Sequence, residues 1–134
     1  MGENILYEEV SGKIIGAAIA VLNELKPGLD EKLYERALTI ELQETGLKTE
    51  QQKQFPVKYK GHDIGKLIPD LIVEDLIIVD PKVVQSFTET HVVQMIGYLA
   101  KTGLRLALLI NFKYSKLQWK RVVRNQEFNR GLHR

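Results

Sequence analysis

Apolar residues recur with two different spacings along the 134-residue chain, and these spacings predict both helices and strands. Helical spacing runs from about Tyr7 to Leu25, from a cap at Asp30 to about Thr45, and from about Thr88 to Thr102. A glycine lies at or near the end of each stretch, where the left-handed cap conformation favours it. We therefore expect three helices with these approximate bounds.

Stretches typical of β-strands lie between the second and third helices and after the third. We expect strands over 48–59, 64–73, 76–84 and 104–111, with turns at 60–63 and around Glu74-Asp75. The pattern over 117–124 predicts a short element without assigning its type. The run from Leu76 to Val79 has no polar side chain, which is typical of a strand buried on both faces. The order ααβββαβ followed by that element predicts an α/β fold, in which helices flank a mixed sheet.

The composition is that of an ordinary globular protein, with 44% apolar and 27% charged residues, and we expect one domain over 1–134. The chain has no cysteine, which excludes disulfides and thiolate–metal chemistry, and its three histidines lack metal-ligand spacing. The longest apolar run, Ile14 to Leu22, is too short to span a bilayer, and no secretory signal is visible. We therefore expect a cytoplasmic protein without a membrane role.

The net charge of +2 is unevenly distributed along the chain. From Lys113 to Arg134 there are seven Lys or Arg and one acidic residue, whereas the other 112 residues carry 12 basic and 16 acidic ones. A basic C-terminal tail from about 113 is typical of a protein that binds a polyanion such as nucleic acid, although a solvated surface explains it equally well. The candidate nucleic-acid contacts in it are Lys113, Lys116, Lys120, Arg121 and Arg124.

The segment from Pro69 to Lys82 combines two carboxylates and a lysine with an apolar hairpin. Asp80 and Lys82 share one face of the second strand, because side chains alternate along a strand. A three-residue turn would place Asp70 opposite Asp80, whereas a two-residue turn would pair Asp70 with Val79 and direct its side chain to the other face. In the first register the carboxylates would repel unless a cation or a proton joins them, which predicts a divalent-metal site beside Lys82. The alternative is a turn flanked by an ordinary Asp–Lys pair.

Two helices offer further polar candidates. Glu31 begins the second helix, where it either complements the helix dipole or supplies another carboxylate to the metal. One face of the third helix carries a polar stripe of His91, Gln94, Tyr98 and Lys101. The stripe is either a solvated face or a set of contacts, with Gln94 at a phosphate or water and Tyr98 and Lys101 nearer a nucleic-acid backbone.

Together these residues resemble the GxxExxY family within the PD-(D/E)XK nuclease superfamily. The family's name motif matches residues 28–34, through Gly28, Glu31 and Tyr34, and the nuclease signature matches Pro69-Asp70 with Asp80-Pro81-Lys82. Residues 91–99 are similar to the glutamine-bearing helix after the core hairpin, and 107–112 and 120–123 to the closing strand and tail. The resemblance covers about Tyr7 to Arg124.

The resemblance implies a restriction-endonuclease-like core and a nuclease that hydrolyses phosphodiester bonds of nucleic acid, with DNA favoured over RNA. It implies Mg²⁺ as cofactor, with Mn²⁺ as a substitute, and it allows a homodimer. By carry-over, Glu31, Asp70 and Asp80 would hold the metal, Lys82 would serve the attacking water, and Gln94 would assist catalysis.

Pro81 departs from the family pattern, in which an ordinary apolar residue separates the acid from the lysine. Proline removes a donor from the strand ladder, so it either ends the ladder early or displaces Lys82. The alternative function is therefore a non-catalytic nucleic-acid-binding or assembly module that keeps the nuclease fold.

Overall fold

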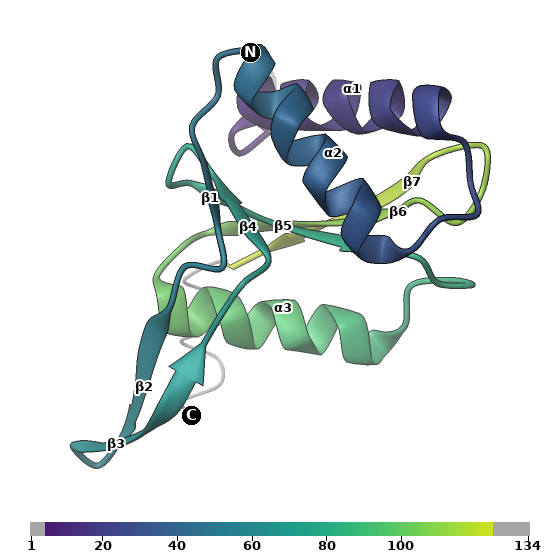
Figure 1. Ribbon diagram of the computed structural model, residues 1–134. Coiled ribbons are helices and arrows are strands. Elements are labelled where there is room, and N and C mark those ends of the chain that lie inside the picture. The colour runs from purple at the N-terminus through teal and green to yellow at the C-terminus, as the bar shows by residue number, and fades with distance from the viewer. Residues whose placement is uncertain (1–4, 125–134) are drawn as a thin grey trace.

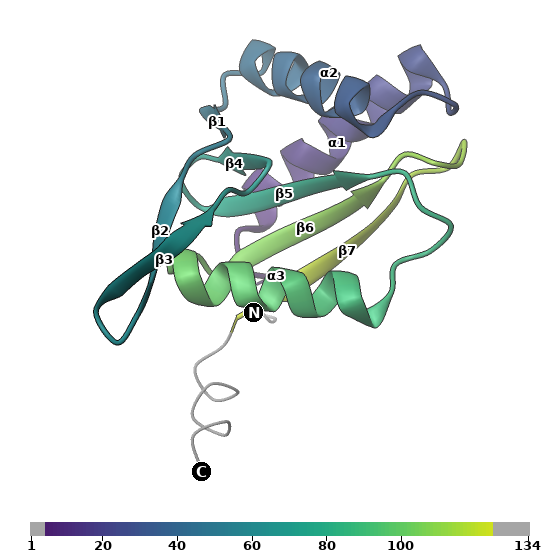
Figure 2. The same cartoon turned by 60° about the horizontal axis from the view of Figure 1, so that its bottom comes forward.

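A twisted mixed β-sheet with helices on both faces forms the body of the protein, and a separate two-stranded hairpin extends from it (Figure 1, Figure 2). The computed structural model describes residues 5–124. Their elements, in chain order, are α1 (Glu8–Leu25), α2 (Glu31–Glu44), β1 (Thr49–Gln51), β2 (Phe55–Tyr59), β3 (His62–Leu67), β4 (Leu71–Val73), β5 (Ile77–Lys82), α3 (Glu89–Thr102), β6 (Leu106–Asn111) and β7 (Gln118–Val123).

The larger sheet has the strand order β1-β4-β5-β6-β7. Strands β5 and β6 are parallel and are linked through α3, whereas the other neighbouring pairs are antiparallel. This arrangement is the mixed, helix-flanked sheet that the sequence predicts, and it is consistent with a restriction-endonuclease-like fold. No helix within residues 5–124 is both long enough and apolar enough to cross a membrane.

The apolar run of β5 is buried on both faces, as predicted, because it lies between two helical layers. Ile77 and Val79 pack into a cluster with α1 and α2, while Ile78 packs on the other face with Met95 and Leu99 of α3. All three β5 residues are at most 1% exposed. The strand that carries the candidate site is therefore held from both sides.

Two stretches predicted as single continuous strands are each interrupted, so this part of the prediction is wrong. The stretch 48–59 is divided into β1 and β2, with Gln52 at φ 59° between them, and 64–73 is divided into β3 and β4 around Pro69. Proline cannot donate a ladder hydrogen bond, which explains the second break. As a result β1 and β4 belong to the large sheet, while β2 and β3 pair only with each other.

The element predicted over 117–124 is the edge strand β7. Residues 113–117 connect it to β6, so this part of the predicted basic tail belongs to the folded body. The rest of the predicted tail, residues 125–134, lies outside the described residues.

Candidate metal and active site

The β4–β5 hairpin has the register that the metal-site hypothesis requires. A three-residue turn, Glu74 to Leu76, joins the strands, and the pairs run from Val73 opposite Ile77 to Leu71 opposite Val79. Continuing this register places Asp70 opposite Asp80. Glu74 and Asp75 have left-handed backbone angles of φ 56° and 57°, which closes the turn tightly.

Asp70 and Asp80 share a low-dielectric environment and interact directly. Burial is the main cause that raises the pKa of Asp70 to about 6, and a hydrogen bond and charge repulsion from the Asp80 carboxylate raise it further. Burial also raises the pKa of Asp80, against the opposing effect of the Lys82 ammonium. Two carboxyl groups with raised pKa values at one point of a sheet edge favour a proton or a cation between them.

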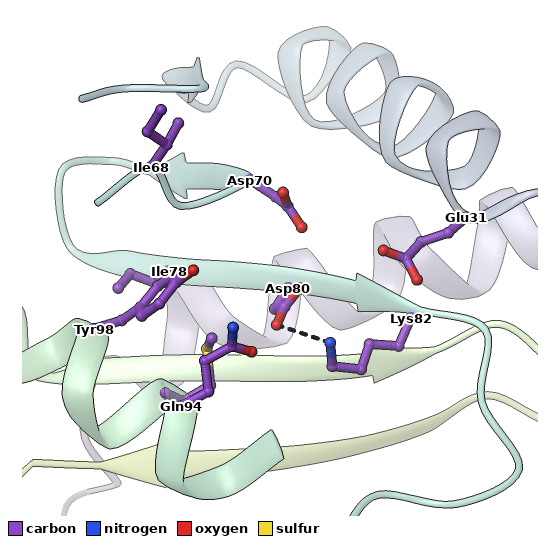
Figure 3. A pocket seen from close by; sticks show the side chains of 9 residues that line it. Glu31, Ile68, Asp70, Ile78, Asp80, Lys82, Gln94 and Tyr98 are labelled. Carbon is purple, nitrogen blue, oxygen red and sulfur yellow. Dashed lines mark ion pairs between the residues drawn. The ribbon is translucent and has the colours of Figure 1, made fainter. Parts of the chain in front are cut away.

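Lys82 lies next to this pair. Its Nζ is 3.3 Å from Oδ2 of Asp80, and its side chain is 14% exposed. An ammonium with so little access to solvent strongly favours a nearby anion, whether a carboxylate or a phosphate. Figure 3 shows the lysine directed back along the strand toward Asp80.

Pro81 does not displace Lys82, because its missing N–H would point away from the neighbouring parallel strand. The amide of Phe112 donates to the carbonyl of Lys82 at 2.9 Å, so Lys82 faces β6 and Pro81 faces the β4 side. Strand β4 begins at Leu71, which pairs with Val79, so it provides no ladder partner opposite Pro81. The proline therefore occupies a position where the ladder needs no donor.

Glu31 reaches the same pocket from the start of α2. The preceding turn is fixed by Tyr34, which is fully buried, donates from Oη to the carbonyl of Lys26 at 2.6 Å and accepts from the amide of Leu29 at 3.1 Å. Gly28 in this turn has φ 116°, a conformation that favours glycine. The local fold thus determines where α2 begins and directs the Glu31 carboxylate into the pocket (Figure 3).

Only two of the four residues in the polar stripe of α3 line the pocket. Gln94 and Tyr98 line the pocket, where burial and the charges of Asp80 and Asp70 raise the pKa of Tyr98. His91 instead forms a capping box with Thr88, in which its Nδ1 accepts from the Thr88 amide at 3.0 Å. Lys101 is exposed in the last turn of the helix and does not line the pocket.

These side chains meet in one cavity of about 160 Å³ (Figure 3). Its lining combines the polar residues above with an apolar wall, and consists of Glu31, Ile68, Asp70, Ile78, Asp80, Lys82, Gln94, Met95 and Tyr98. Within residues 5–124, however, no three or more His, Cys, Asp or Glu side chains are gathered closely enough to hold a metal ion between them. Asp70 and Asp80 form the close pair, and Glu31 faces them from another element. This donor set fits a hard cation that takes one or two carboxylates and fills its other positions with water and phosphate.

The sequence patterns missed two groups that support the pocket. Glu35, 2% exposed, accepts from Lys32 Nζ and from Gln51 Nε2, both at 3.1 Å, and so joins α2 to β1. Lys32 opposes the raised pKa of Asp70 by its charge, so this pair also adjusts the electrostatics of the site. The i, i+3 spacing of Lys32 and Glu35 was the available signal, but such spacing is common on exposed helix faces.

Asn111 is the second missed residue. It is fully buried opposite Lys82, and its Oδ1 accepts from the amides of Val84 and Lys113, both at 3.1 Å. Its Nδ2 donates to the carbonyl of Val84 at 2.8 Å and to Gln118 at 3.1 Å. The amide side chain therefore fixes the chain just beyond Lys82. A single asparagine at the end of a strand gives no sequence signal for this role.

The five basic residues predicted to contact nucleic acid lie outside the pocket, on β7, just after it and in the loop before it. Arg121 donates to Ser11 Oγ at 3.0 Å and to the carbonyl of Leu6, so its guanidinium anchors the start of α1. Lys120 lines a separate pocket beside Phe87, and Lys116 lines another against α1. Lys113 is exposed in the β6–β7 loop, and Arg124 follows β7. None of the five lines the cavity that holds Asp70 and Asp80.

Comparison with known families agrees with this arrangement. The family described as the PD-(D/E)XK nuclease superfamily matches residues 8–122, which includes every residue that lines the pocket. Nucleases of this superfamily generally depend on divalent metal ions and act on nucleic acid. No curated protein and no solved structure matches the chain.

Proposed function

The chain belongs to the PD-(D/E)XK nuclease superfamily, and on that basis we propose that it is a Mg²⁺-dependent nuclease that hydrolyses phosphodiester bonds of DNA. The observation that supports this most strongly is the pair of opposed carboxyl groups, Asp70 and Asp80, with the Lys82 ammonium 3.3 Å from Asp80. Structural ion pairs are usually exposed, whereas these groups lie in a cavity with Glu31 and Gln94.

Asp70, Asp80 and Glu31 are the residues that would hold the cation. A bound Mg²⁺ would supply Lewis-acid polarisation of the phosphate and a more acidic water. Carboxylates are ligands only when ionised, so Asp70, with a pKa of about 6, has to lose its proton for the cation to bind.

Lys82 and Gln94 are the residues that would act on the reacting groups. The Lys82 ammonium can stabilise the charge that develops on the phosphate oxygens as water attacks phosphorus and the ester P–O bond breaks. The Gln94 amide, which lines the pocket beside Lys82 and Tyr98, can orient that water or a phosphate oxygen. The apolar wall of Ile68, Ile78 and Met95 keeps the pocket low in dielectric, which strengthens both interactions.

Within the superfamily we assign the chain to the GxxExxY family, because each motif residue has a separate physical task at this site. Gly28 provides the φ of 116° in the turn, and Tyr34 closes that turn with hydrogen bonds and stacks on Phe112, with ring centroids 4.8 Å apart. Glu31 lies between them and faces the pocket. The spacing of the motif is therefore what brings one helix-borne carboxylate to the sheet.

Cleavage assays with single variants test the proposal. With Mg²⁺ or Mn²⁺, we expect Asp80→Asn and Lys82→Ala each to reduce DNA cleavage by roughly 10²–10³-fold or more, as loss of one preorganised charge usually does. Glu31→Gln should reduce it less, because Glu31 stands apart from the close pair. Glu44→Gln on the exposed end of α2 and Lys13→Ala on α1 are the matched controls, with the same chemical changes outside the pocket.

The outcomes separate the two candidate functions. Cleavage that survives Asp80→Asn would place the activity elsewhere or in a contaminant. DNA binding without cleavage by the wild type would instead support the non-catalytic module. Pro81 pairs with Ile110 of β6 without facing it with its missing N–H, and Lys82 still lines the pocket, which supports the catalytic proposal over that module.

A further inference from the structure

The β2–β3 hairpin is the least buried part of the described chain, and the fold gains little from its length. From Phe55 to Leu67, only Phe55, Val57 and Leu67 are even half-buried, and the other residues are exposed. Tyr59 and Ile64 are 60% and 63% exposed. Two-stranded hairpins are marginally stable by themselves, so an extended one that exposes large side chains indicates a surface for a partner.

The charge of this hairpin, which we call the arm (residues 55–67), is positive. It carries Lys58, Lys60 and Lys66 and a single carboxylate, Asp63. Lys58 and Lys66 share a face, because Pro56 pairs with Lys66 and Lys58 is two residues beyond Pro56 on the same strand. Within residues 5–124 none of the three lysines forms an ion pair with a carboxylate. Their charges are therefore available to an anionic partner.

The arm begins at the candidate active site. Ile68, the residue after β3, lines the cavity, and Asp70 follows two residues later. At the other strand, Phe55 packs into the same apolar cluster as Tyr98 of α3, which also lines the cavity. Figure 2 shows the arm extending from this edge of the sheet, away from the body. A polymer held by the arm would pass close to the carboxylate pair.

The shape of the arm favours one partner. Strands of five and six residues rise about 3.3 Å per residue, which gives the arm a length of roughly 15–20 Å. The major groove of B-form DNA is about 12 Å wide and admits a two-stranded ribbon, whereas the major groove of A-form RNA is too narrow to be entered. The register shift between Val57 and Lys58 adds twist to the ribbon, which suits a helical groove.

We propose that the β2–β3 arm is the principal DNA-binding element, which enters the major groove of duplex DNA beside the pocket and contacts its phosphates through Lys58, Lys60 and Lys66. This proposal rests on the nuclease function above and deepens it, since it specifies a duplex DNA substrate and a surface to hold it. It differs from the sequence-based expectation that the basic residues from 113 onward make these contacts. The pocket itself is acidic and would repel phosphates, so a basic surface beside it is needed for affinity.

Duplex binding at several salt concentrations, measured by fluorescence anisotropy without divalent ions, tests the arm. The arm triple variant (Lys58→Ala, Lys60→Ala, Lys66→Ala) is compared with a triple that removes the same charge at the rival surface (Lys113→Ala, Lys116→Ala, Lys120→Ala). Each lost phosphate contact lowers the salt slope by about one unit, so we expect the arm triple to lower it by about 2–3 and the affinity by roughly 10–100-fold. The rival triple should lose less than half as much.

Several results would overturn the proposal. These are an equal or larger loss in the rival triple, tighter binding to duplex RNA than to duplex DNA, and wild-type protein that binds no duplex DNA. A change of oligomeric state in the arm triple, with DNA binding intact, would make the arm a contact between protein chains instead. Unchanged melting temperatures are expected in both triples, because all six lysines are exposed.

The same experiment separates the arm from the proposed catalysis. If wild-type protein binds duplex DNA through the arm but does not cleave it with Mg²⁺ or Mn²⁺, the arm stands and the nuclease proposal fails. If it cleaves only single strands or RNA, the nuclease chemistry stands and the arm proposal fails.

Discussion

Two antiparallel hairpins follow each other along the chain, and they differ in almost every physical respect. The β4–β5 hairpin lies inside the sheet, where helices cover both faces and Ile78 is 1% exposed. The β2–β3 hairpin projects from the sheet edge, where Ile64 is 63% exposed. Burial on both faces, rather than hairpin formation itself, is therefore what holds catalytic side chains in fixed positions. An exposed hairpin can contribute to function only through its charge and through the distance it extends from the body.

The largest difference between the two hairpins is expected when one glycine is inserted into each of them. One glycine inserted between Leu71 and Ile72, inside β4, adds a residue between the buried pairs nearest the turn and Asp70, and so directs Asp70 to the opposite face of the sheet. We expect cleavage to fall by roughly 10³-fold or more, since the carboxylate pair is lost. One glycine inserted after Gly61, in the β2–β3 turn, should leave cleavage at saturating DNA within about tenfold of wild type, because it leaves the pocket intact. Equal losses in the two variants would show that the arm helps to form the catalytic geometry.

Amide hydrogen exchange measures how differently the two hairpins are protected from local opening. Amides of β4 and β5 should exchange only through global unfolding, whereas those of β2 and β3 should exchange through local opening. The expected difference in protection is at least about 10³-fold, since the arm has little buried apolar surface to hold it. Similar protection in the two hairpins would mean that the arm is packed against something in solution, such as a second copy of the chain.

Truncation of one isoleucine in each hairpin gives the corresponding difference in stability. Ile78→Ala leaves a cavity between the sheet and α3 and should cost about 3 kcal/mol of unfolding free energy. Ile64→Ala removes exposed methyl groups and should cost less than about 0.5 kcal/mol. Denaturant unfolding of both variants measures this directly. A loss above about 1 kcal/mol in Ile64→Ala would contradict the exposed position of that side chain.

A smaller effect is expected from the proton on Asp70. Burial and the Asp80 carboxyl raise its pKa to about 6 in the folded protein, above the ordinary value of 3.8. The folded state therefore holds a proton that the unfolded chain has lost, so the stability contributed by this group is complete below about pH 4 and is lost as the pH rises through about 6. Asp70→Asn mimics the protonated form and should melt a few degrees above wild type at neutral pH without divalent ions.

Below about pH 4 the difference in melting temperature between Asp70→Asn and wild type should disappear, because the wild-type carboxyl is then protonated in both the folded and the unfolded state. A constant difference at all pH values would indicate that the substitution acts through packing. Asp63→Asn, an exposed carboxylate on the arm, is the control for the removal of one negative charge.

The sequence predicted the elements with strong periodicity and the local geometry of the site. All three helices lie within one residue of their expected ends, because apolar spacing, capping residues and glycines agree there. The three-residue turn and the opposed Asp70 and Asp80 were one of two registers that the sequence left open. Burial of alternate side chains in two helical layers selects between them, and that is a tertiary effect.

The division of the strands around Gln52 and Pro69 could not be read from the apolar pattern. Its consequence, a projecting arm, depends on which sheet each short strand joins. The role of Arg121 could not be predicted from the sequence either, because its hydrogen bonds to Leu6 and Ser11 join residues more than a hundred positions apart. Charge counted along the chain therefore pointed to a single basic surface, whereas the fold uses Arg121 to anchor the start of α1 and leaves all five basic residues outside the pocket.

Calorimetric titration with Mn²⁺ is the most direct test of the carboxylate pair as a cation site. We predict that the wild-type protein binds the ion, that Asp80→Asn abolishes this binding, and that Glu44→Gln leaves it unchanged. Binding near pH 6 should also release protons to the buffer, because Asp70 is then partly protonated. Absence of binding by the wild type, or equal binding by the wild type and Asp80→Asn, would contradict the central claim.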